Sequence, residues 1–125
     1  MPKKRNTREF DRLVEDGLAL IPEEIRALMN NVEIVVEEEP SEELLEELDV
    51  PPDETLFGLY QGIPLTERST AYSAFPDRII IFRRPLLDEF DDPLDIRREV
   101  ARTVIHEVAH HFGISEERLV ELGWD

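Results

Sequence analysis

The spacing of apolar residues predicts helices at the start of the chain. Through residues 6–20 and just beyond, apolar side chains and one glycine recur at helical spacing: Phe10, Leu13, Val14, Gly17, Leu18 and Ile21. Asn6 or Thr7 can serve as the N-cap of this helix. Pro22 then opens a second short helix, PEEIRALMN, because the first helical position does not need the N–H that proline lacks.

Three segments in the middle of the chain have the pattern of strands. VEIVVEE (32–38) is too short and too rich in β-branched residues for a helix, and TLFGLYQG (55–62) is the second candidate. DRIIIFRRPL (77–86) contains three consecutive isoleucines followed by phenylalanine, which is typical of a strand buried on both faces. Between the strands, the sequence predicts a short helix or turn over 40–52 and an irregular or weakly extended segment over 63–75.

The longest predicted helix covers residues 93–112. Pro93 suits its first turn, and Gly113 can end it in the left-handed conformation. Ser115 then caps a last short helix, EERLVELG. The order of helices, strands and helices predicts an α+β fold, in which a small twisted sheet is packed on one side by helices. With 125 residues, we expect one domain over 1–125.

The charge and the residue usage exclude several kinds of function. Thirty acidic and fourteen basic residues give a formal charge of −16, which argues against DNA or RNA as a partner because nucleic-acid affinity depends on neutralising phosphates. The chain has no cysteine, so disulfides, thiolate catalysis and cysteine-bound zinc are excluded. Residues 33–54 contain eleven acidic residues and no basic one. This segment is expected to be a solvated face, and binding of a basic partner is the alternative.

No apolar run in the sequence has the length of a membrane span, for which about eighteen or more residues are needed. The basic N-terminus is also not followed by the apolar run of a secretory signal. We therefore expect a soluble, cytoplasmic protein without a membrane partner. A monomer is the default expectation for its oligomeric state.

All three histidines lie in HEVAHHFGISEE, which begins at His106 near the end of the longest predicted helix. An α-helix turns about 100° per residue, so His106 and His110 lie about 40° apart on one side, as two imidazoles must to share one metal ion. They are expected to face solvent or a cleft, because they lie opposite an apolar stripe. The stripe consists of Val100, Ala101, Val104, Ile105, Val108, Ala109 and Phe112. His111 points away from this side, so packing or solvent exposure is expected for it.

Glu107 completes a His-Glu-x-x-His pattern. In this pattern the carboxylate takes a proton from a metal-bound water, whose pKa zinc lowers from about 15.7 to about 7. A catalytic zinc usually has three protein ligands. Gly113 can let the chain fold back, so Glu116 is a candidate third ligand, and Glu117 and Glu121 are the alternatives. The pattern thus predicts one Zn²⁺ per chain, against the alternative of a solvated helix face with incidental histidines.

The segment HEVAHHFGISEE resembles the motif of the small bacterial zincin-like metallopeptidases, also called minimal zincins. The likeness continues through LFGLYQGIPLTER and PDRIIIFRRPL to ELGW, over most of residues 55–124. The resemblance implies a twisted sheet packed against an active-site helix, with His106 and His110 as zinc ligands and Glu107 as the general base. Glu116 falls where metzincins have their third histidine and related families have aspartate. The methionine that metzincins place below the metal has no counterpart after Glu116.

The resemblance also implies hydrolysis of peptide bonds, with a peptide or protein as the partner. Zincins bind extended peptides along an exposed sheet edge, and STAYSAF (69–75) is the expected edge here. The substrate-binding candidates in this segment are Ser69, Thr70, Ala71, Tyr72 and Ser73. The candidates for stabilising the oxyanion are Tyr60, Tyr72, Arg68 and Arg102. The alternative function is a zinc-binding scaffold that holds a peptide or protein without cleaving it.

Overall fold

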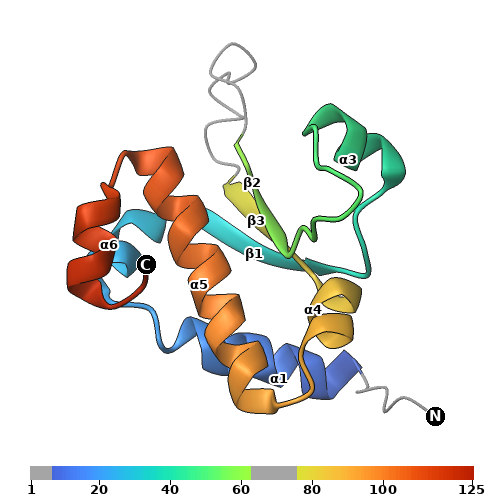
Figure 1. Cartoon of the computed structure of the whole chain (residues 1–125). Helices are drawn as coiled ribbons and strands as arrows, with labels where there is room; N and C mark the ends of the chain where they lie inside the picture. The colour runs from blue at the N-terminus through green and yellow to red at the C-terminus, as the bar shows by residue number, and fades with distance from the viewer. Residues whose placement is uncertain (1–6, 63–75) are drawn as a thin grey trace.

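The computed structural model describes residues 7–62 and 76–125, which form a small sheet and the helices around it (Figure 1). In chain order, the elements are α1 (Thr7–Leu18), α2 (Glu23–Arg26), the 3₁₀ helix η1 (Ala27–Met29), β1 (Val32–Glu37), α3 (Glu42–Glu47), β2 (Gly58–Gln61), β3 (Asp77–Phe82), α4 (Arg83–Glu89), α5 (Pro93–Phe112) and α6 (Glu116–Leu122). This arrangement confirms the predicted α+β fold. The helix predicted to follow Pro22 is divided into α2 and η1.

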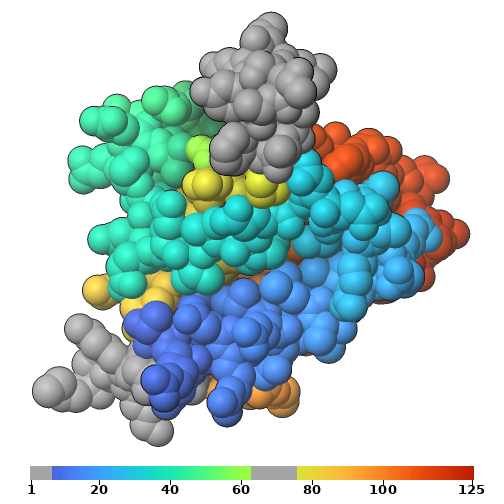
Figure 2. Space-filling view, turned by 180° about the vertical axis from the view of Figure 1, so that it is seen from behind, coloured from blue at the N-terminus to red at the C-terminus, as the bar shows by residue number. Residues whose placement is uncertain are grey.

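The sheet is mixed, with the strand order β1-β3-β2. β1 pairs parallel with β3, and β2 pairs antiparallel with the other side of β3. Every residue from Ile79 to Phe82 in the central strand is buried, as predicted for a strand covered on both faces. Seen from behind, β1 lies at the surface between α1 and the segment that carries α3 (Figure 2).

Within the described residues, β2 is one of the two edge strands of this sheet, and β1 is the other. The Phe82 N–H donates to the Phe57 carbonyl at 2.8 Å, which makes these two residues a hydrogen-bonded pair. Because such pairs alternate along antiparallel strands, the main-chain groups of Gly58 and Tyr60 point away from β3. These groups therefore lie on the side of β2 that is opposite β3.

The strand predicted over 77–86 is too long. β3 ends at Phe82, and α4 begins at the next residue. Pro85 explains the difference, because proline cannot donate to a strand ladder but fits the first turn of a helix, where its N–H is not required. Leu86 of α4 is fully buried in the core and so holds this helix in place.

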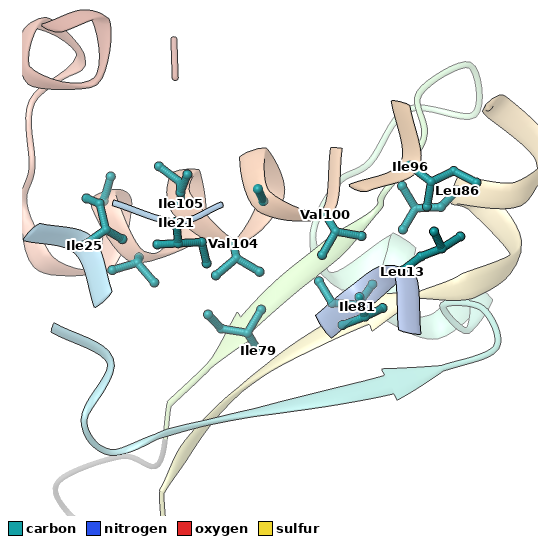
Figure 3. Close-up of a cluster of buried hydrophobic side chains, with 14 of the residues drawn as sticks. Leu13, Ile21, Ile25, Ile79, Ile81, Leu86, Ile96, Val100, Val104 and Ile105 are labelled. Atoms are coloured by element: carbon teal, nitrogen blue, oxygen red, sulfur yellow. The ribbon is translucent and has the colours of Figure 1, made fainter. Parts of the chain in front are cut away.

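The core lies between the sheet and the helices α1 and α5 (Figure 3). Side chains of α5 point toward Ile79 and Ile81 of the sheet, and α1 closes the cluster from another side. The buried α5 residues are Ile96, Val100, Ala101, Val104, Ile105, Val108 and Ala109. This confirms the predicted apolar stripe except for Phe112, which is 43% exposed and lies against the ring of His111 at the surface. Each fully buried Val or Ile contributes about 1.5–3 kcal/mol relative to an exposed one.

Local capping fixes both ends of α5 and the start of α6. The Asp92 side chain accepts a hydrogen bond from the Leu94 N–H at 2.9 Å, and Pro93 occupies the first turn. At the other end Gly113 has a φ of 76°, the left-handed conformation that was predicted. Ser115 then accepts a hydrogen bond from the Arg118 N–H at 3.1 Å and starts α6.

None of the helices in the described ranges combines the length and apolar character that a membrane crossing requires.

We expect Gly17→Ala to destabilise the crossing of α1 and α5. A β-carbon at this position would lie 2.7 Å from the Arg97 carbonyl oxygen and 3.0 Å from the Val100 β-carbon. This overlap outweighs the helix propensity that alanine gains over glycine, so the free energy of unfolding should fall by about 1–2 kcal/mol. Urea unfolding measures the loss. Gly62→Ala is the control, since its nearest neighbours would lie at 3.7 Å. Equal losses in both variants would contradict the close crossing.

Candidate metal centre

A pocket of about 510 Å³ lies where β2, α5 and the start of α6 meet. Its walls are Phe57, Gly58, Thr103, His106, Glu107, Ala109, His110, Gly113, Ile114 and Glu116. Four residues singled out from the sequence as metal ligands or general base are therefore brought together. Three of them come from two consecutive turns of α5, and the fourth comes from the first turn of α6.

The three candidate carboxylates for a third ligand lie in different surroundings. Glu116 lines the pocket, because the left-handed turn at Gly113 directs the chain back toward α5. Glu121 lies 3.4 Å from the Arg118 guanidinium, with which it forms an ion pair. Glu117 is exposed and does not line this pocket. The position of Glu116 supports it over the two alternatives.

The donor set of the pocket fits a zinc ion. Two imidazoles and two carboxylates line it, and its described walls include no lysine or arginine to compete for those carboxylates. Zinc accepts this combination of nitrogen and oxygen donors. Within residues 7–62 and 76–125, however, no three histidine, aspartate or glutamate side chains already lie close enough to share an ion. His106 Nε2 instead lies 2.7 Å from the Trp124 carbonyl oxygen, so side chains must rotate before a metal is held.

Glu107 has the surroundings of a proton acceptor. It is half-buried, and this burial raises the pKa of its carboxyl above the ordinary value. A hydrogen bond with the main chain of Tyr60 opposes part of the rise, as do the nearby imidazoles of His110 and His106. A raised pKa brings a carboxylate closer to the range in which general bases work best near neutral pH. The outward N–H of the edge strand thus orients Glu107 toward the pocket.

Gly58 is a pocket residue that the sequence analysis did not single out. A β-carbon here would lie 2.6 Å from Thr103 Cγ2 and 2.9 Å from the Ile80 carbonyl oxygen, so only glycine allows β2 to approach α5 this closely. A glycine inside a strand is a signal of such an approach and could have been noticed. The main-chain N–H of Tyr60 and the carbonyl of Trp124 gave no signal, because every residue carries such groups.

The other sequence-based candidates lie elsewhere. The Tyr60 hydroxyl donates to Asp77 Oδ2 at 2.7 Å, and its ring stacks on His111 with the centroids 4.0 Å apart. Arg102 donates to the main-chain oxygen of Asp125 at 2.7 Å. Neither Tyr60 nor Arg102 lines the pocket. The remaining candidates fall outside the described residues: Arg68, Ser69, Thr70, Ala71, Tyr72 and Ser73.

We expect Gly58→Ala to displace β2 from α5 and to lower the free energy of unfolding by about 1–3 kcal/mol. Adding Thr103→Ser removes the methyl group that the new β-carbon would meet, so the double variant should recover part of the loss. The contact with the Ile80 carbonyl remains, and recovery is therefore incomplete. Urea unfolding of the two single variants and the double variant measures this coupling. Strict additivity of the two substitutions would contradict the close contact.

Comparisons with known proteins agree with this fold. The model of the zincin-like metallopeptidase family matches residues 29–124. A solved structure of a conserved hypothetical protein from Thermo thermophilus is similar with a TM-score of 0.56 and 21% sequence identity, over 93% of this chain and 98% of that chain. None of the curated proteins matches the chain. With most of its length covered by the family model, the chain belongs to the zincin-like metallopeptidases.

Proposed function

We propose that this protein is a zinc-dependent peptidase that uses Glu107 as its general base. His106, His110 and Glu116 would hold the ion. The observation that supports this proposal is that all four side chains line the same pocket, beside β2, which is an edge strand among the described residues. Membership of the zincin-like metallopeptidases supports the same reaction class.

The proposed chemistry divides between the metal and the protein. Bound zinc would polarise a carbonyl and lower the pKa of a water to about 7. Glu107 would accept a proton from the attacking water and deliver it to the nitrogen of the leaving amine. The Tyr60 main chain orients the Glu107 carboxylate for this transfer, and the partial burial of Glu107 favours proton uptake.

The edge of the sheet supports an extended peptide as the substrate. The main-chain groups of Gly58 point away from β3 and toward the side on which the pocket lies. An added strand pairs with such groups through main-chain hydrogen bonds. Phe57 and Ile114 give the pocket apolar walls for a neighbouring side chain. The proposed edge at 69–75 stays a prediction.

A zinc-binding scaffold without turnover is the second candidate. One observation favours it: the described pocket walls contain no arginine, lysine or tyrosine that could stabilise an oxyanion. The Thr103 hydroxyl is the remaining side-chain donor apart from the imidazoles and carboxylates. This alternative predicts peptide binding in the presence of zinc, with no cleavage by the wild-type protein.

Purified protein should contain about one zinc ion per chain, and the metal should depend on the pocket residues. His110 is exposed, so His110→Ala should lose the ion without unfolding the chain. Glu116→Gln should weaken zinc binding roughly tenfold or more, since losing even an outer partner of a ligand costs about 10–100-fold. Glu117→Gln is the matched control, because it removes the same charge from the next residue. Elemental analysis and competition with a chelator measure both effects. Equal affinities for the two glutamine variants would exclude Glu116 as a ligand.

Glu107→Gln should keep zinc and lose hydrolysis. The amide has nearly the same shape but cannot accept the proton, so the rate should fall by about 10²–10⁴-fold. Mass spectrometry of a mixture of unstructured peptides measures cleavage, and elemental analysis of the same sample confirms the metal content. Full activity in this variant would exclude Glu107 as the base. Zinc binding without cleavage by the wild type would favour the scaffold instead.

A further inference from the structure

The segment 123–125 folds back onto the polar face of α5. Gly123 has a φ of 82° and ends α6 in the left-handed conformation. The Trp124 N–H then donates to the Leu119 carbonyl at 2.8 Å, which fixes the turn. As a result, the chain after α6 runs beside α5 (Figure 1).

Three residues of α5, each one turn from the next, contact this segment. The Arg98 guanidinium lies 5.0 Å from the centroid of the Trp124 ring, as in a cation–π interaction. Arg102 binds the main-chain oxygen of Asp125 at 2.7 Å. His106 Nε2 lies 2.7 Å from the Trp124 carbonyl oxygen. The row of side chains continues to His110, so the segment occupies the part of the helix face next to the pocket.

The contact at His106 has a chemical consequence. A carbonyl oxygen only accepts hydrogen bonds, so Nε2 must carry the proton that it donates to Trp124. A ring nitrogen that carries a proton has no free lone pair for a metal. The same nitrogen therefore cannot bind Trp124 and an ion together.

We propose that segment 123–125 is a latch that competes with the metal for Nε2 of His106. The proposal rests on the proposed function, since it takes His106 and His110 as ligands. Loading of the pocket then requires the Trp124 carbonyl to release His106 and the imidazole proton to move to Nδ1. The contacts of Arg98 and Arg102 set how readily the segment releases.

NMR of protein with ¹⁵N-labelled histidine tests the latch directly. At about pH 8, where free imidazole is neutral, the metal-free protein should show His106 with its proton on Nε2. After addition of zinc alone, the proton should be on Nδ1. Metal-free His106 without a proton on Nε2 would overturn the latch, as would zinc-bound His106 that keeps that proton and binds through Nδ1. If zinc changes neither His106 nor His110, the proposed metal site itself fails, which is a different result.

Variants of Trp124 test the competition by affinity. Trp124→Ala loses the ring that Arg98 covers, so the latch should loosen and zinc should bind roughly fivefold more tightly, the equivalent of one neutral hydrogen bond. Trp124→Phe keeps an aromatic ring and should bind zinc like the wild type. Leu122→Ala is the control for general loosening at the end of α6 and should also leave the affinity unchanged. Circular dichroism checks that each variant folds. Unchanged or weaker zinc binding by folded Trp124→Ala would overturn the latch.

Discussion

The burial of one face of α5 is the constraint on which the rest of the structure depends. Val100, Val104 and Val108 are fully buried against the sheet and α1, so the helix cannot rotate about its axis without exposing them. Residues on the opposite side, including His106 and His110, are thereby held toward the pocket. The hydrophobic effect that buries one face of α5 thus sets the direction in which His106 and His110 point.

The polar face of α5 is divided between two environments. Arg98 and Arg102 lie along the part that segment 123–125 covers, whereas His110 lies in the part that opens to the pocket. His106 stands between the two parts, since it contacts the Trp124 carbonyl and also lines the pocket. No described wall of that pocket carries an arginine or a lysine. Two carboxylates in described walls that hold no arginine or lysine favour a cation, and the formal charge of −16 strengthens the same preference over an anionic ligand.

The sequence was informative wherever the structure is determined by local chemistry. α5 followed from its helical period, its proline start and its glycine end, and α6 followed from the cap at Ser115. The predicted end of the strand over 77–86 was wrong, since β3 ends at Phe82 and Pro85 favours the helix that follows. The surroundings of the candidate site depend on main-chain groups brought close by tertiary packing. The sequence alone does not indicate which carbonyl or N–H group will lie next to the side chains of the candidate site.

The topology of the sheet has a consequence for how the chain folds. The central strand, β3, is the last of the three to be synthesised, and both β1 and β2 pair with it rather than with each other. Among the strands of residues 7–62 and 76–125, the two earlier ones have no partner in this sheet until Asp77–Phe82 has left the ribosome. Such non-local pairing slows folding and leaves strand edges available to other chains. A nascent chain halted before β3 is therefore expected to depend on chaperones to remain monomeric.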